Sequence, residues 1–185
     1  TSGKKLNDFL NCDHCCWWFI GCRLVCVFLK RTAMIQLLLN RDDYVSAWVQ
    51  SKLEDFYFRD CKAIGIIKKQ KLIAAVVYSN LRDGQIEATI VIEDKNWANK
   101  AILYALFAYP FVQCNCHRIL VTVRDNNKKS IKLAKRLGFK HEGVLRQMFP
   151  PHDAVLLGML RSECKWLNIK GNNYGKVKTI STTSA

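Results

Sequence analysis

Apolar and polar positions alternate with two different periods along residues 34–167 of this 185-residue chain. Short apolar runs rich in β-branched and aromatic residues, such as Leu72 to Tyr78, are typical of buried strands. Between them, apolar residues recur every three or four positions, as in the stretch from Ile102 to Phe107, which indicates helices. The interleaving of both periods predicts a mixed α/β (α+β) fold.

The pattern predicts elements in the order β-α-β-β-β-α-β-α-β-β. We expect Asp42 and Asp43 to cap the first helix, Pro110 to end or kink the second, and Gly138 to close the third. The predicted strands are Met34–Leu39, Cys61–Ile67, Leu72–Tyr78, Gln85–Glu93, His117–Val123, Phe139–Arg146 and Ala154–Arg161, and the predicted helices are Tyr44–Asp55, Ala98–Val112 and Lys128–Leu137.

Changes in composition divide the chain into three parts. Residues 1–33 hold five of the nine cysteines and read as an extension of uncertain status, 34–167 as the folded domain, and 168–185 as a flexible basic tail. A zinc-binding appendage is an alternative for the extension, but its spacing matches no paired-ligand pattern. The candidate ligands are Cys12, His14, Cys15 and Cys16, with Cys22 and Cys26 further on. We therefore predict no metal site.

The net charge of +14 predicts a surface that attracts polyanions, such as coenzyme A, nucleic acid or an anionic membrane. Charge alone does not choose among them. The apolar run from Cys15 to Leu29 is interrupted by Arg23 and is shorter than the roughly 20 residues of a spanning helix, so we predict no membrane segment. The uneven placement of the cysteines favours a reducing compartment, and we expect a cytoplasmic protein.

The most informative segment runs from Asn127 to Arg146. Taken singly, its residues have ordinary structural explanations, because Asn127 can cap a helix and Gly138 can end it. Taken together, they form a pattern: an Asn after a strand, Ser130 three positions on, a helix closing on Leu-Gly-Phe, and then Glu-Gly-Val-Leu-Arg. In this pattern the sequence resembles the GNAT superfamily of N-acetyltransferases, and its end looks like the branch of the ribosomal-protein alanine acetyltransferases.

The resemblance extends over about Ile35 to Leu167 and includes features of GNAT proteins from phages and bacteria. It implies a mostly antiparallel seven-stranded sheet that splays between its fourth and fifth strands. It also implies acetyl-CoA as cosubstrate, with the pantetheine arm in the splay beside Ile90, Val91 and Ile92 and close to Asn127 and Ser130. In such proteins backbone N–H groups stabilise the oxyanion while an amine attacks the thioester.

The junction from Glu93 to Lys100 departs from the family pattern. At this place GNAT proteins carry a Gly-rich loop that opens a helix and holds the coenzyme pyrophosphate. Here no glycine lies between Gly84 and Gly138. The candidate binding residues of this junction are Trp97, Ala98, Asn99 and Lys100.

Transfer of an acetyl group to an amine needs a base for the amine and an acid for the departing thiolate. Alternation along the fourth strand places Glu87 and Glu93 on one face, and both are candidates for the base. Many family members have a tyrosine as the acid where this chain has Ala134. The acceptor is an amine that the sequence does not name, either a protein N-terminus or a small molecule, and the oligomeric state is also open.

A second hypothesis is a non-catalytic module of the same fold whose basic surface binds nucleic acid. The basic helix residues Lys128, Lys129, Lys132, Lys135 and Arg136 favour it, as do the missing loop glycines and Ala134. The combination of Asn127 with Ser130 favours the enzyme, because a decayed coenzyme cleft has no need of that asparagine.

Overall fold

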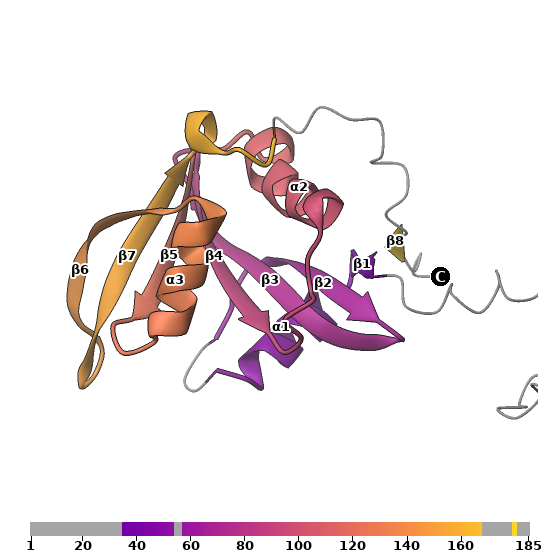
Figure 1. Ribbon diagram of the computed structural model, residues 1–185, viewed down its shortest axis with the longest axis horizontal. Coiled ribbons are helices and arrows are strands. Elements are labelled where there is room, and N and C mark those ends of the chain that lie inside the picture. Colours follow the sequence, from indigo (N-terminus) through magenta and orange to yellow (C-terminus); the bar gives the residue numbers. More distant parts are fainter. Residues whose placement is uncertain (1–34, 54–56, 168–178, 181–185) are drawn as a thin grey trace, which may run out of the picture. The chain divides into compact units, whose positions relative to one another are not determined.

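An eight-stranded sheet is the centre of the unit Met34–Ala185 in the computed structural model shown in Figure 1. The structure describes residues 35–53, 57–167 and 179–180, which belong to the unit Met34–Ala185. The order across the sheet is β6-β7-β5-β4-β3-β2-β1-β8. The strands are β1 (Gln36–Leu38), β2 (Lys62–Lys68), β3 (Lys71–Arg82), β4 (Gln85–Ile92), β5 (Arg118–Arg124), β6 (Lys140–Phe149), β7 (His152–Leu160) and β8 (Thr179–Ile180).

All seven predicted strands are confirmed, with bounds that shift by a few residues. The eighth, β8, pairs in parallel with β1 through Leu37 and Thr179, within the segment predicted as a tail. A two-residue strand in a polar stretch leaves no alternation to detect, which is why the sequence pattern missed it. The sheet is mixed but mostly antiparallel, and its central parallel pair is β4 with β5.

Helices cover both faces of the sheet. Helix α1 (Asp42–Gln50) buries Val45 and Val49 against one face, in a cluster with Ala75 and Val77 of β3. Helices α2 (Lys100–Ala108) and α3 (Lys128–Leu137) lie on the opposite face and pack into the larger cluster. No helix in the described parts of the chain is long and apolar enough to cross a membrane.

The predicted cap of the first helix is wrong. Helix α1 begins after Arg41 without a side-chain cap, and it ends at Gln50, five residues before the predicted end. The Asp42 carboxylate instead accepts hydrogen bonds from the backbone N–H of Ala63 at 2.7 Å and from Nζ of Lys62 at 2.9 Å. It therefore ties the helix to strand β2, a tertiary role that local sequence signals do not reveal.

Pro110 changes the second helix as predicted. The α-helical part ends at Ala108 and continues as one π-helical turn, Tyr109–Gln113. The turn buries the Phe111 ring completely, with its centroid 6.5 Å from that of Phe107 in a stacked arrangement. Both rings belong to the main core cluster, which includes sheet residues, so their burial holds the C-terminal end of α2 on the sheet.

Helix α3 matches its predicted bounds, because strong signals stand at both ends. The side-chain oxygen of Asn127 accepts a hydrogen bond from the Ser130 N–H at 3.1 Å. At the other end Gly138 has φ of 115°, and its N–H bonds to the carbonyls of Ala134 and Lys135. Only glycine adopts this left-handed conformation without strain.

Gly138→Ala should lower the free energy of unfolding by about 1–2 kcal/mol, because a Cβ at positive φ is strained. Urea unfolding measures the change. Gly143→Ala is the matched control: a Cβ there meets no atom within 4 Å and φ is not positive, so we expect a change below about 0.5 kcal/mol. Equal losses for both variants would contradict the explanation.

Candidate active site

Strands β4 and β5 diverge, as predicted. They pair in parallel only at Gln85 with Arg118, Ile86 with Ile119, and Glu87 with Leu120. Beyond Glu87, β4 continues to pair with β3 on its other side. The backbone of residues 88–92 therefore has hydrogen-bonding groups directed toward β5 without a strand to receive them.

A cleft of about 330 Å³ occupies the space between the diverging strands. Its walls come from the two strands and from helix α3, with contributions from the end of β6 and from the turn after α1. The lining residues are Lys52, Leu53, Ala88, Thr89, Ile90, Val121, Thr122, Val123, Arg124, Asn127, Ser130, Leu133, Ala134, Leu137 and Phe149.

Three predicted coenzyme-binding residues line this cleft: Ile90, Asn127 and Ser130. The Oδ1 atom of Asn127 is engaged in the helix cap, so its Nδ2 group is the part that can donate to a ligand. Ala134 forms part of the buried wall of α3. The tyrosine that the family resemblance leads one to expect at this position is thus replaced by a small apolar side chain.

The other predicted coenzyme contacts lie outside the cleft lining. Trp97 is only 6% exposed and packs in the main core, with Ala98 against the same cluster. Asn99 caps α2, because its side-chain oxygen accepts from the Ile102 N–H at 3.0 Å. Lys100, the first residue of α2, is exposed. The remaining two, Val91 and Ile92, belong to β4 just beyond the residues that line the cleft.

The loop 93–99 forms without glycine at no cost in backbone strain. The backbone N–H groups of Glu93 and Asp94 both donate to the Ile73 carbonyl, at 2.8 and 3.3 Å. Asp94 also accepts from the Asn96 N–H at 2.8 Å, which closes a local turn. No residue of this loop, which is described throughout, has a positive φ.

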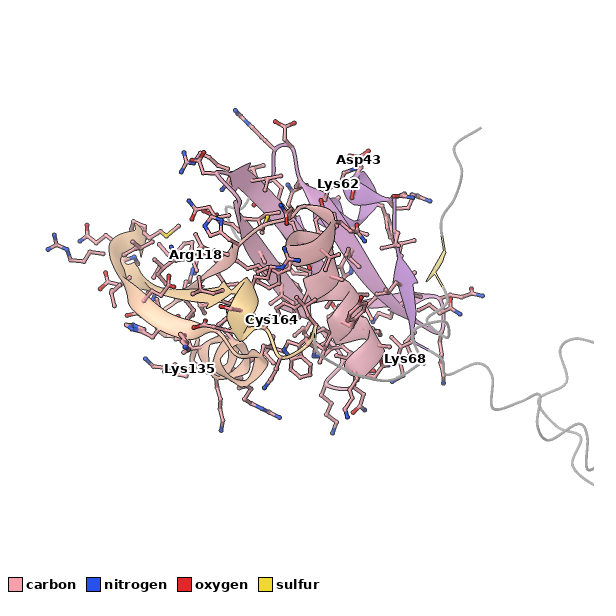
Figure 2. All side chains as sticks on the ribbon, turned by 90° about the horizontal axis from the view of Figure 1, so that it is seen from above. Asp43, Lys62, Lys68, Arg118, Lys135 and Cys164 are labelled. Carbon is pink, nitrogen blue, oxygen red and sulfur yellow. The ribbon has the colours of Figure 1, made fainter. Side chains whose placement is uncertain are left out.

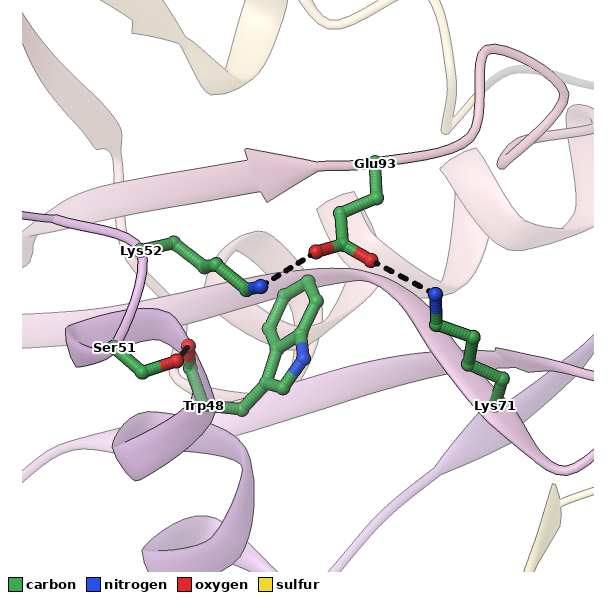
Figure 3. A network of polar contacts seen from close by, with 5 residues as sticks. All are labelled: Trp48, Ser51, Lys52, Lys71 and Glu93. Carbon is green, nitrogen blue, oxygen red and sulfur yellow. Dashed lines mark hydrogen bonds and ion pairs between the residues drawn. The ribbon is translucent and has the colours of Figure 1, made fainter.

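Glu93 lies between two lysines immediately after β4, as Figure 3 shows. Its carboxylate is 2.7 Å from Nζ of Lys52 and 3.6 Å from Nζ of Lys71. The hydrogen bond from Lys52, supported by Lys71, lowers the pKa of Glu93 below its ordinary value. A carboxylate with a lowered pKa is a weaker base, so this candidate is poorly suited to deprotonate an amine.

Glu87 occupies the closed end of the opening, on the face of the sheet that α1 covers. One carboxylate oxygen accepts a hydrogen bond from Nδ2 of Asn80 at 3.0 Å, and no cation pairs with it among the described residues. Glu87 and Leu120 line a second, more polar hollow. The residues that follow them on the same two strands, Ala88 and Val121, line the cleft. Glu87 is therefore open to a ligand.

Several cleft residues were missed by the sequence analysis. Thr122 and Arg124 alternate with the core residues Val121 and Val123 on β5, and this period of two could have identified them. Three further missed side chains come from distant segments, and no sequence signal points to them. These are Lys52, Leu53 and Phe149.

The predicted basic run lies on the outer face of α3. All five of its side chains are exposed, and no ion pair involves them within the described parts of the chain. Figure 2 shows Lys135 at this surface. No group of three or more potential metal ligands occurs among the described residues, and the cysteines and histidine considered for zinc in 1–33 lie outside them.

Neither family models nor the sequences of curated proteins match this chain. Solved structures do match. A structure of mutant forms of the spermidine/spermine N-acetyltransferase from Vibrio cholerae is 18% identical, with a TM-score of 0.60 over 73% of this chain and 98% of that one. A dodecameric structure of the Vibrio cholerae spermidine N-acetyltransferase is also 18% identical, with a TM-score of 0.59 over 74% of this chain and 97% of that one.

The ribosomal-protein-S5-alanine acetyltransferase from Vibrio fischeri is 20% identical, with a TM-score of 0.48 over 57% of this chain and 64% of that one. A structural similarity this low does not assign the chain to the branch of the ribosomal-protein alanine acetyltransferases, so that assignment stays a prediction. The two spermidine acetyltransferase structures match over nearly their whole length, with TM-scores of 0.59 and 0.60. The chain therefore has the fold of the GNAT superfamily of N-acetyltransferases.

Proposed function

We propose that this protein is an acetyl-CoA-dependent N-acetyltransferase that transfers the acetyl group directly to an amine, either a protein N-terminus or a small molecule. The observation that carries the proposal is the cleft between β4 and β5. There, an unpaired stretch of β4 backbone faces β5 beside the start of α3. A chain that kept this fold but no longer bound the coenzyme would gain stability by closing the opening with strand pairing or core side chains.

The unpaired backbone of residues 88–92 suits a ligand that itself carries amide groups. The pantetheine arm of coenzyme A has two amides, and it can pair with this edge as an added strand would. Asn127 offers its Nδ2 group from the opposite wall. An N–H of the same β4 edge would donate to the acetyl oxygen as negative charge develops on it.

The start of α2 suits the coenzyme phosphates. Asn99 satisfies two of the first backbone N–H groups, those of Ile102 and Leu103. The N–H groups of Lys100 and Ala101 have no partner among the described residues, and the positive end of the helix dipole adds to them. Lys100 also brings its own charge to this end.

Glu87 is the better of the two candidate bases. It has no cationic partner in the described structure and opens to a hollow, whereas Glu93 is held by Lys52 and Lys71. In the proposed reaction Glu87 takes a proton from the amine, directly or through water. The amine nitrogen bonds to the acetyl carbon, the carbon–sulfur bond breaks, and a water protonates the thiolate because Ala134 supplies no donor.

Acetyl-CoA at 100 times its dissociation constant should stabilise the protein by about 2.7 kcal/mol, or about 5–10 °C in melting temperature at this size. Asn127→Ser should shrink this shift, because serine keeps the helix cap but loses the amide donor. Thermal unfolding of both proteins with and without the coenzyme measures the effect. No shift of the unmodified protein at millimolar acetyl-CoA would refute the proposed function.

The alternative function, a non-catalytic module that binds nucleic acid, is favoured by the exposed basic face of α3. Its five cations are available to phosphates, since no described carboxylate neutralises them. Association with DNA or RNA that weakens steeply with salt, in a protein that does not bind acetyl-CoA, would support this alternative.

A further inference from the structure

Arg124 is a cation inside the cleft without an anionic partner among the described residues. It ends strand β5, and its guanidinium makes a cation–π contact with the Phe149 ring, with Cζ 5.4 Å from the ring centroid. This contact fixes the side chain but uses none of its five N–H donors. Among the described residues no carboxylate pairs with Arg124, and no acceptor receives a hydrogen bond from its side chain.

The charges along the cleft have one sign. Only Lys52 and Arg124 among the lining residues are charged, and both are cations. Lys52 is neutralised by Glu93 at 2.7 Å, so the uncompensated charge belongs to Arg124. A polycation would meet repulsion in this part of the cleft, whereas an anionic group would find a preorganised partner.

Arg124 lies on the face of the sheet opposite to the one expected for the coenzyme phosphates. Its neighbour Val123 packs into the core beneath α2 and α3, and alternation places Arg124 on the α1 face. Glu87 shares that face, since its neighbours Ile86 and Ala88 pack toward α2. The N–H groups at the start of α2, which we propose for the phosphates, lie on the face that α2 and α3 cover.

We propose that the acceptor is an amine that also carries an anionic group, a carboxylate or a phosphate, and that Arg124 binds this group. The proposal rests on the proposed function. Leu120 is opposite Glu87, and Arg124 follows four residues later, about 13 Å along the strand. Both side chains are long enough to lean toward one another along this face, so we take as the acceptor a molecule that carries its amine and its anion on one short chain.

Matched acceptors test the proposal in the full-length protein. Transfer from acetyl-CoA is measured with β-alanine against β-alaninamide, with phosphoethanolamine against ethanolamine, and with spermidine. We expect kcat/KM to be about tenfold or more higher for the anionic member of at least one pair, with spermidine poor, because a charge-assisted bidentate contact has this size. The favoured pair also tells carboxylate from phosphate.

Substitutions at Arg124 test whether its guanidinium causes the preference for the anionic acceptor. Arg124→Gln should bring the ratio within that pair close to one, and Arg124→Lys should keep part of it. Arg146→Gln, at an exposed position on β6, is the control and should keep the full ratio. The stabilisation by acetyl-CoA should persist in all three variants, and their melting temperatures without ligand show that they are folded.

The contrary outcomes are distinct. Equal rates within both pairs, or spermidine as the best acceptor, would overturn the proposal while leaving the acetyltransferase activity in place. A loss of acetyl-CoA binding in Arg124→Gln with an unchanged acceptor ratio would also overturn it and assign Arg124 to the coenzyme. Absence of acetyl-CoA binding by the unmodified protein would instead refute the proposed function itself.

Discussion

Glu87→Gln should lower kcat for acetyl transfer by about 10²–10⁴-fold, the range over which a general base contributes. Glutamine has the same shape and can keep the contact with Asn80 by turning its amide. It cannot accept the amine proton. Steady-state rates at saturating acetyl-CoA, measured against pH, give the effect, and the stabilisation by acetyl-CoA should be unchanged because the residue lies outside the coenzyme cleft.

Glu93→Gln, at the residue that follows β4, is the matched control. Its carboxylate is already engaged by Lys52 and Lys71, so we expect a loss in kcat of less than about tenfold. If this variant loses as much activity as Glu87→Gln or more, the base is Glu93 and the assignment made from the ion pairs is wrong. Similar small losses in both variants would show that water alone removes the proton.

Phe111→Ala should lower the free energy of unfolding by about 3–5 kcal/mol, as expected for loss of a fully buried aromatic ring. The ring joins the π-helical turn to Phe107, which in turn contacts Phe139 after α3 and Trp166, at centroid distances of 6.2 and 6.4 Å. The variant should therefore loosen α2 as well. Urea unfolding with an unchanged m-value would measure a difference in stability alone.

Val112→Ala is the control for this substitution. The next residue in the same turn is 54% exposed, so its truncation should change the unfolding free energy by no more than about 0.5 kcal/mol. A loss below about 1 kcal/mol for Phe111→Ala would mean that the cavity collapses. The turn would then contribute little to holding α2 in place.

The elements with strong local signals were predictable from the sequence alone. Helix α3 has a capping asparagine at one end and a left-handed glycine at the other, and its bounds agree with the prediction. Helix α1 does not, because Asp42 bonds to Ala63 of β2 rather than to its own helix. Capping residues with a competing tertiary partner look the same in the sequence as those without one.

The site was predictable only in part for a similar reason. Alternation along the predicted strand Gln85–Glu93 treats Glu87 and Glu93 alike, although β4 itself ends at Ile92. Their difference arises from Lys52 and Lys71, which come from other elements of the chain. Likewise, Phe149 reaches Arg124 from the end of β6. Such contacts join residues that are far apart in the sequence and depend on how the helices and strands pack. A short sequence segment therefore does not reveal them.

The turn that leads from β4 into α2 bears on how such proteins can diverge. Because every residue from Glu93 to Asn99 has an ordinary right-handed or extended backbone, each position can carry any side chain that its surroundings admit. Introducing glycine there would enlarge the unfolded ensemble, at a cost of about 0.5–1 kcal/mol per residue, without relieving strain. The backbone of this segment therefore places no demand for glycine on the sequence. A search that requires glycines at this position would miss chains that form the same turn without them.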